Sequence, residues 1–244
     1  MRRILEVCAN SLQSALNAQE AGTDRIELCE NLSIGGTTPS IGTIIQSRKR
    51  LSIGINVLVR PRGGDFLYSD NEFDTIREDI QQLKKHGVNG VVCGILLPDG
   101  NIDIARTKEL VELSKPLTFT FHRAFDFTQD PFRALEDIIQ TGADHILTSG
   151  QQTTAIQGEH LIKELIKQSA GRIIIMPGSG VSAETIELLI ETGANEFHMS
   201  GTTQHQSGMT FIKPFLSISD RGDDYLITSS DIEKIRRVID LLNE

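Results

Sequence analysis

The residues of this chain that could do chemistry stand at the ends of short apolar segments. The first segment ends in Leu5-Glu6-Val7-Cys8, and the second ends, 21 residues later, in Ile26-Glu27-Leu28-Cys29. Alternate residues of an extended strand point to the same side, so each segment places a carboxylate and a thiol on one face. Carboxylates serve as general acids and bases, and thiolates bind Cu(I) and zinc. The two segments therefore predict acid–base or metal chemistry at one location.

Arginine and histidine stand in three further segments. Arg60 and Arg62 follow the third segment and are expected to share a face, because they are two positions apart. His122 directly follows the fifth segment, and the eighth carries His198. Charged side chains are rarely buried unless they are paired, so their convergence favours a functional site. The side chains expected to converge are Glu6, Glu27, Arg60, Arg62, His122 and His198.

Two interpretations of this cluster stay open. In the first, the cluster is catalytic and performs isomerase-type or lyase-type proton transfer. Glu6 or Glu27 is then the general base, and His122 or His198 is the acid. In the second, glutamates and arginines pair with each other and only close the sheet. The second interpretation is favoured for Glu196, which stands at the start of its segment and so lies deeper in the fold.

A loop with two glycines follows the seventh segment and leads to a helix that Ser182 is expected to cap. Loops at this position of α/β barrels bind phosphate through backbone N–H groups. Arginine side chains would reinforce such a site through charge-assisted hydrogen bonds. A simple tight turn is the alternative. The residues predicted to bind a small anionic ligand are Arg60, Arg62, Gly178, Ser179 and Gly180.

The cysteines support a metal-binding hypothesis only if the first two strands are neighbours. In that case Cys8 and Cys29 stand at the same end and are predicted to share a metal ion. Cysteine is also common as a small buried apolar residue. Burial is therefore the alternative for both residues, and it is the expectation for Cys93 on the fourth strand.

The chain lacks the sequence patterns that mark several classes of reaction and cofactor. No expected strand end carries a lysine, which argues against a Schiff-base aldolase. The chain has no P-loop, no dinucleotide fingerprint and no zinc-protease motif, so no organic cofactor is implied. For Arg123, an ion pair with Asp126 is as consistent with the sequence as a ligand contact.

Short apolar segments alternate with helical patterns along the whole chain. This alternation predicts parallel strands joined by helices, and eight such units in 244 residues predict a single-domain TIM (β/α)₈ barrel over 1–244. An open doubly wound sheet is the alternative. Residues 201–229 are predicted to form a long loop that covers the barrel mouth or contacts another subunit. The expected strands are residues 4–8, 25–29, 53–59, 88–94, 117–121, 145–148, 172–176 and 196–199.

Helix starts are marked by capping patterns. Ser69 followed by Glu72 predicts a capping box, and Asp130 before Pro131 predicts an N-cap. Asn10, three residues before Gln13, is also expected to cap a helix.

Composition narrows the classes of partner and location. Asp and Glu outnumber Lys and Arg, 33 to 24, and the net charge of −9 argues against a nucleic-acid partner. Three cysteines are too few for a disulfide framework and favour a reducing compartment. No apolar run suits a signal peptide or a membrane span. We therefore expect a soluble, cytoplasmic protein without a membrane partner.

The chain resembles the CutC family, known as copper homeostasis proteins. The most specific matches are Arg60-Pro61-Arg62-Gly63-Gly64-Asp65-Phe66 and His122-Arg123-Ala124-Phe125-Asp126. The resemblance implies a TIM barrel, a cytosolic location, a homo-oligomer and a role in copper handling. It implies Cys8 and Cys29 as copper ligands. An enzyme acting on a small anionic substrate and a non-catalytic scaffold are the other functions consistent with the residues. The matching segments are residues 5–8, 24–29, 60–66, 121–126, 147–150 and 177–181.

Overall fold

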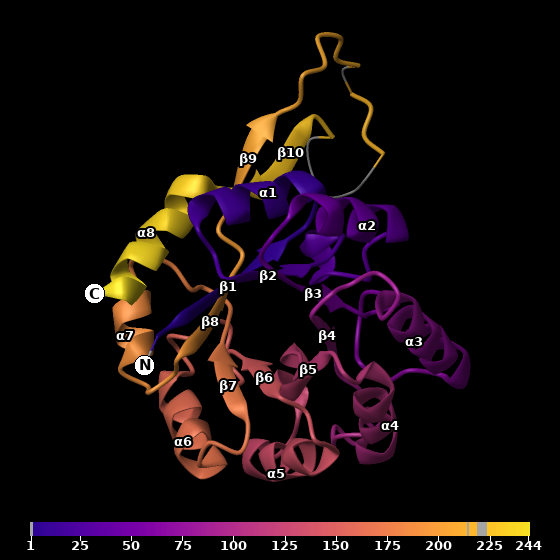
Figure 1. Ribbon diagram of the computed structural model, residues 1–244, viewed down its shortest axis with the longest axis vertical. Helices are drawn as coiled ribbons and strands as arrows, with labels where there is room; N and C mark the ends of the chain where they lie inside the picture. Colours follow the sequence, from indigo (N-terminus) through magenta and orange to yellow (C-terminus); the bar gives the residue numbers. More distant parts are fainter. Residues whose placement is uncertain (1, 214, 219–223) are drawn as a thin grey trace.

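The structure, a computed structural model, describes residues 2–213, 215–218 and 224–244. Within these residues, eight parallel strands form one sheet that curls into a barrel, and helices surround it (Figure 1). The strands are β1 (Ile4–Ala9), β2 (Arg25–Leu28), β3 (Gly54–Leu58), β4 (Gly90–Cys93), β5 (Thr118–Phe121), β6 (His145–Thr148), β7 (Ile174–Pro177) and β8 (Glu196–Met199).

Strand order confirms the predicted TIM barrel and excludes the open doubly wound sheet. The strands pair in the order β7-β6-β5-β4-β3-β2-β1-β8, so chain order is kept around the ring. A parallel bridge between Gly178 and His198 joins the two ends of this sheet. The predicted bounds of β6 and β8 are those observed, and the other strands differ by one to three residues at their ends.

Helices follow the strands around the outside of the barrel (Figure 1). The predicted capping box of Ser69 and Glu72 is present, and Asp130 accepts hydrogen bonds from the amides of Phe132 and Arg133. Asn10 is not the cap of the first helix, because Ser11 accepts from the Ser14 amide instead. The helices are α1 (Leu12–Ala21), α2 (Ile41–Arg50), α3 (Asp70–Leu83), α4 (Ile104–Ser114), α5 (Pro131–Thr141), α6 (Glu159–Ser169), α7 (Ile186–Ile190) and α8 (Ile232–Asn243).

Side chains divide between the two faces of the barrel sheet, as period-two alternation predicts. Leu5 and Val7 of β1 belong to the large apolar core between strands and helices. The alternate residue Cys8 instead joins Cys29, Leu58 and Val92 in a small cluster inside the barrel. The barrel interior therefore holds the thiols, while the outer face of the sheet provides most of the apolar core.

Residues 201–229, predicted as a loop, contain regular structure. β9 (Thr202–Gln206) pairs with β10 (Leu226–Ser230) in an antiparallel ribbon. This ribbon and the described residues between its two strands, 207–213, 215–218 and 224–225, project from the barrel next to α1 (Figure 1). The sequence does not predict the strand Thr202–Gln206, because it consists of Thr, Gln and His, is largely exposed, and lacks the alternation of apolar residues that marks a strand. No helix of the described ranges is long and apolar enough to cross a membrane.

Candidate metal and ligand site at the barrel mouth

A pocket of about 470 Å³ opens where the strands end. Strands β1, β2 and β8 contribute Cys8, Glu27 and His198 to it, and His122 follows the end of β5. This is the position where active sites of this fold lie. Of the six charged side chains predicted to converge, four line the pocket. These are Glu27, Arg60, His122 and His198.

The two cysteines predicted to share a metal lie side by side. Because β1 and β2 are hydrogen-bonded neighbours, Cys8 Sγ and Cys29 Sγ are 3.4 Å apart. Cys29 is fully buried, while Cys8 borders the pocket. The contact with Cys29 raises the pKa of the Cys8 thiol well above its ordinary value, and burial and nearby carboxylates raise it further. All three cysteines of the chain are free thiols.

Cys93 is separate from this pair. It is buried in the core between the sheet and the helices, and burial raises its pKa to about 12. Cys93 is therefore a core residue, as expected from the sequence.

Glu27 adds an oxygen donor to the two thiols. One oxygen of Glu27 and the sulfurs of Cys8 and Cys29 all lie within 4.8 Å of one another. Its Oε2 atom is buried and has no hydrogen-bond partner in the described part of the chain. Burial raises the pKa of Glu27 to about 7, an effect that His198 opposes and the charge of Glu6 reinforces. Glu27 is therefore a buried carboxylate with an unused acceptor at the pocket.

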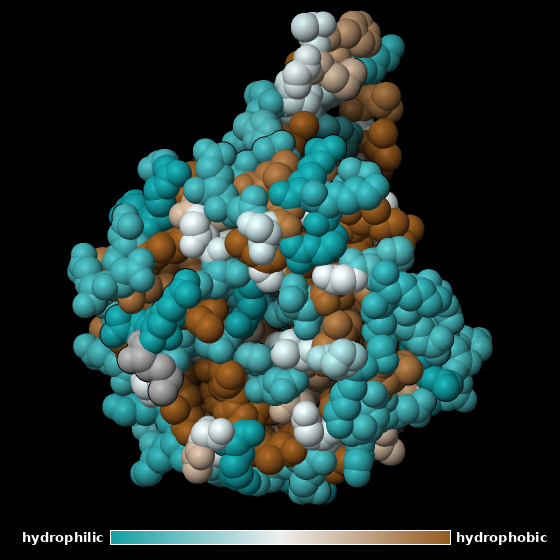
Figure 2. Space-filling view, in the orientation of Figure 1, coloured by the Kyte–Doolittle hydropathy of each residue, from teal (hydrophilic) through white to brown (hydrophobic). Residues whose placement is uncertain are grey.

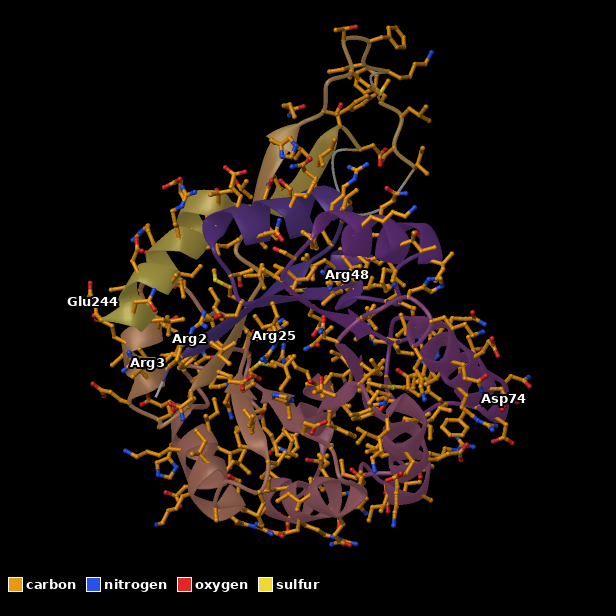
Figure 3. The ribbon with its side chains drawn as sticks, in the orientation of Figure 1. Arg2, Arg3, Arg25, Arg48, Asp74 and Glu244 are labelled. Atoms are coloured by element: carbon orange, nitrogen blue, oxygen red, sulfur yellow. The ribbon has the colours of Figure 1, made fainter. Side chains whose placement is uncertain are left out.

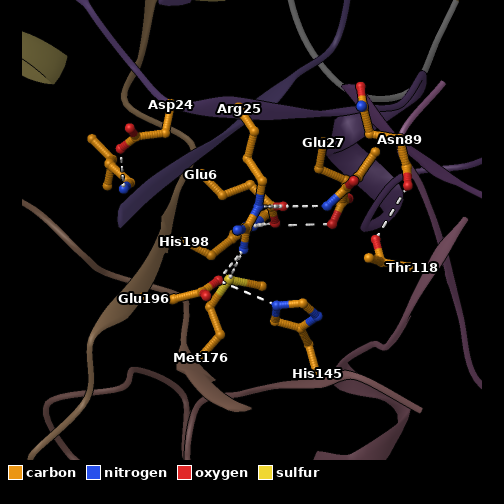
Figure 4. Close-up of polar contacts among 12 residues, drawn as sticks. Glu6, Asp24, Arg25, Glu27, Asn89, Thr118, His145, Met176, Glu196 and His198 are labelled. Atoms are coloured by element: carbon orange, nitrogen blue, oxygen red, sulfur yellow. Dashed lines mark hydrogen bonds and ion pairs between the residues drawn. The ribbon is translucent and has the colours of Figure 1, made fainter. Parts of the chain in front are cut away.

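Glu6 has the same spacing from a cysteine but a different environment (Figure 4). Its Oε2 accepts from Arg25 Nε at 2.7 Å and from Asn56 Nδ2 at 2.8 Å, and its Oε1 lies 2.9 Å from His198 Nδ1. Burial raises the pKa of Glu6, but Arg25 and His198 outweigh it and hold that pKa well below its usual range. Both oxygens are engaged, so Glu6 orients His198 from behind the pocket.

Arg25 connects this site to a deeper layer of the barrel. Its Nη2 lies 2.5 Å from Glu196 Oε2 and 3.3 Å from Met176 Sδ, and His145 Nε2 is 3.3 Å from the same carboxylate (Figure 4). Glu196 therefore lies deep and paired, as its position in the sequence suggested. Sequence reasoning missed Arg25, although its place two residues before Glu27 puts both side chains on one face of β2.

The two predicted anion-binding arginines do not share a face. Arg60 lines the pocket, but its Nη atoms donate to the carbonyls of Ile34, Gly36 and Gly64 at 2.6–2.9 Å. Arg62 instead pairs with Glu72 at 2.5 Å and with Asp65 at 3.1 Å. It is not among the described residues that line the pocket. Strand β3 ends at Leu58, so period-two alternation no longer applies at these positions.

Two polar groups of the loop after β7 already make hydrogen bonds within the protein. The Gly178 amide donates to Thr148 O at 2.9 Å, and the Ser179 hydroxyl donates to Thr153 O at 2.8 Å. Ser179 and Gly180 line the pocket, whereas Gly178 is not in its described lining. The following helix α7 begins at Ile186 with Thr185 at its N-cap position, so Ser182 is not the N-cap that the sequence predicts.

His122 and Arg123 stand together after β5. His122 Nδ1 accepts from the Ala124 amide at 3.2 Å and caps a short 3₁₀ helix, Arg123–Phe127. Nδ1 is therefore the acceptor, and the ring proton is on Nε2. Burial and the Arg60 charge lower the pKa of His122 to about 3. Arg123 makes the expected ion pair with Asp126 at 2.7 Å, and it also lines the pocket.

Known proteins resemble this chain over nearly its full length. The CutC family matches residues 3–203. A CutC family protein of Chromobacterium violaceum is 42% identical, with all of both chains covered. The human copper homeostasis protein cutC homolog is 43% identical over 96% of this chain and 86% of its own.

Solved structures agree with the family and the fold. A CutC protein from Streptococcus agalactiae has a TM-score of 0.77 at 33% identity, covering 81% of this chain and 98% of that one. The phosphoribosylanthranilate isomerase of Thermotoga maritima has a TM-score of 0.59 at 13% identity, covering 100% of this chain and 99% of its own. That second likeness concerns the barrel fold alone. With a matching family model and relatives above 40% identity along its length, the chain belongs to the CutC family.

Proposed function

We propose that this protein binds copper for copper homeostasis, with Cys8 and Cys29 as the metal ligands. The observation that carries the proposal is the pair of buried thiols 3.4 Å apart beside an open pocket. Related proteins from human and mouse bear the name copper homeostasis protein. The family and the donor atoms support the same ion.

The donor set suits a soft ion. Metal–thiolate bonds are about 2.3 Å long, so a shared ion requires the two sulfurs to be no more than about 4.6 Å apart. The observed separation is below this limit, and Leu58 and Val92 enclose the pair with apolar groups. Thiolate ligands in such surroundings select Cu(I) over hard divalent cations. Cys8 and Cys29 would hold the ion, and the bound ion would be kept from reacting elsewhere.

A cluster of harder donors lies next to the thiols but is less available. Glu6, Glu27 and His198 also have ligand atoms within 4.8 Å of one another. However, Glu6 already accepts from Arg25, and His198 Nδ1 already contacts Glu6. A metal there would have to break these contacts, which favours the cysteine pair.

We also infer a cytoplasmic location and a homo-oligomeric state. A reducing compartment keeps the Cys8 and Cys29 thiols free to bind copper. The apolar side chains exposed on the projecting β9–β10 arm favour contact between copies of the chain.

Competition titration with a chromogenic Cu(I) chelator under anaerobic conditions tests the copper proposal. We expect the wild-type chain to bind one Cu(I) ion. The Cys8→Ser/Cys29→Ser variant should lose at least about 100-fold in affinity, because thiolates are the preferred donors. The matched control is Cys93→Ala, which removes a buried thiol outside the pair and should keep wild-type affinity. Equal affinity of wild type and the double variant overturns the proposal.

A further inference from the structure

Three residues that line the mouth pocket each have a buried polar atom that makes no hydrogen bond within the described residues. These atoms are Glu27 Oε2, Arg60 Nε and His122 Nε2, and Glu27 Oε2 also lies 4.0 Å from His198 Nδ1. Each residue is about 5% exposed and lines the pocket. Buried polar groups are normally satisfied, and leaving one unpaired is costly. A copper ion on the cysteine pair would leave His122 Nε2 unpaired, so the copper site does not account for this pocket.

Glu27 Oε2 and His122 Nε2 require opposite hydrogen-bonding groups. Glu27 Oε2 is an acceptor and calls for a hydroxyl or similar donor. His122 Nε2 carries the ring proton and therefore donates to an oxygen. Glu27 lies on β2 and His122 directly follows β5, with β3 and β4 between these strands, so a single ligand would span the pocket.

Positive charge stands on the His122 side. The Arg123 guanidinium lines the pocket, while its Nε and Nη2 atoms bond Asp126 and Ser149 Oγ. Its remaining nitrogen, Nη1, makes no hydrogen bond with the described residues. An anionic oxygen beside His122 would therefore meet a cation, whereas Glu27 on the opposite side would repel it.

An apolar wall lies beside His122. The Phe66 ring packs 4.9 Å from the His122 ring and 5.4 Å from the Phe127 ring, measured between centroids. Phe127 borders the pocket while 67% of it is exposed, which is unusual for so large an apolar side chain. These rings offer stacking and edge contacts to a flat ligand. The pocket volume of about 470 Å³ is in the range of small-molecule sites.

We propose that the mouth pocket is a binding site for a small aromatic hydroxy acid. The hydroxyl group donates to Glu27, the anionic group accepts from His122 and Arg123, and the ring packs against Phe66 and Phe127. This ligand differs from the copper ion of the proposed function, although the two sites adjoin at Cys8 and Glu27.

Isothermal titration of the metal-free, full-length protein above neutral pH tests the site with 4-hydroxybenzoate as the probe. Two comparison ligands each lack one feature, since benzoate has no hydroxyl group and gluconate has no ring. We expect saturable binding of 4-hydroxybenzoate that is at least about tenfold tighter than either, as one charge-assisted hydrogen bond predicts. Absence of saturable binding overturns the proposal, as does tighter binding of gluconate.

Variants then locate the binding to this pocket. Phe127→Ala should weaken the binding of 4-hydroxybenzoate by about fivefold or more, because the Phe127 ring borders the pocket. The matched control is Phe132→Ala. The Phe132 ring is also exposed but is not among the described residues that line the pocket, so this variant should keep the wild-type affinity. Glu27→Gln should reduce the preference for 4-hydroxybenzoate over benzoate. Equal effects of the two phenylalanine variants, or an unchanged preference in Glu27→Gln, overturn the proposal. Copper binding is measured separately, so either proposal can fail alone.

Discussion

Two glutamates with the same sequence context have opposite electrostatic states in this protein. Glu6 and Glu27 each stand two residues before a cysteine, and both are buried inside the barrel. Arg25 reaches Glu6 and keeps it ionised, while Glu27 lacks such a partner and its pKa rises to about 7. The sequence predicts the convergence of both carboxylates. It does not predict their different states, because these depend on where one arginine side chain turns.

Removal of Arg25 tests the strength of this buried network. Arg25→Met leaves Glu6 and Glu196 without their cation, so we expect the free energy of unfolding to fall by about 3–5 kcal/mol. Denaturant unfolding of the purified variant measures this loss. Figure 3 shows Arg25 directed into the centre of the barrel, unlike Asp74 at the outer surface of α3.

The control for Arg25→Met is an exposed arginine that binds its carboxylate by two hydrogen bonds. Arg172 contacts Glu136 at 2.7 and 2.8 Å on the surface, where solvent screens the pair. Arg172→Met should therefore change stability far less. Similar losses in the two variants would show that burial does not decide the strength of the Arg25 contacts.

His122 should make stability depend on pH. Its folded-state pKa of about 3 lies below the unfolded value of about 6.5. Between these two pH values, the unfolded chain therefore binds a proton that the folded chain does not bind. Stability is therefore lost as pH falls from about 6.5 towards 3, by at most about 1.4 kcal/mol per pH unit from this residue.

The His122→Asn variant isolates that contribution. Asn keeps an acceptor for the Ala124 amide but does not titrate, so the pH slope of its unfolding free energy should be shallower in this window. Denaturation curves at several pH values measure both slopes. Parallel slopes for wild type and variant would mean that His122 does not titrate on unfolding.

At the scale of elements, the sequence predicts most of the strands and helices of the barrel. Strand alternation correctly separates Leu5 and Val7 from Glu6 and Cys8, because one face of β1 packs on helices and the other lines the barrel. The same rule fails at Arg62, which follows the end of β3. Local patterns thus predict residues within an element, while residues in loops depend on contacts distant in sequence.

The capping box of α3 gives a test at this scale. Ser69 accepts from the Glu72 amide, and the Glu72 carboxylate accepts from the Ser69 amide. Ser69→Ala should destabilise the protein by about 1 kcal/mol, whereas Ser69→Asp should retain stability, because Asp is an equally good N-cap. Thermal unfolding of both variants decides this. Equal destabilisation by Ala and Asp would contradict the capping role.

At the scale of the whole molecule, the barrel is predictable and the projecting arm is not. Eight repeated strand–helix units specify the barrel, whereas the β9–β10 ribbon has no sequence pattern that marks it. Apolar side chains are exposed along this arm (Figure 2). They include Phe211, which is 70% exposed, and Ile218, which is 93% exposed.

We expect the exposed arm to contact a second copy of the chain. Large exposed apolar groups on a soluble protein commonly mark an interface. Phe211→Ser/Ile218→Ser should shift the protein towards the monomer in light scattering after gel filtration. The control Leu188→Ser removes an exposed apolar residue of α7, away from the arm, and should leave the mass unchanged. Identical masses for wild type and the arm variant would refute this role.

X-ray absorption at the copper edge tests the central claim most directly, since it reports the atoms bound to the metal. For wild type loaded with one Cu(I), we expect sulfur neighbours from Cys8 and Cys29. In Cys8→Ser/Cys29→Ser loaded in the same way, these sulfur neighbours should disappear, while Cys93→Ala should keep them. A first shell of only oxygen and nitrogen in the wild-type protein would contradict copper binding by the paired thiols.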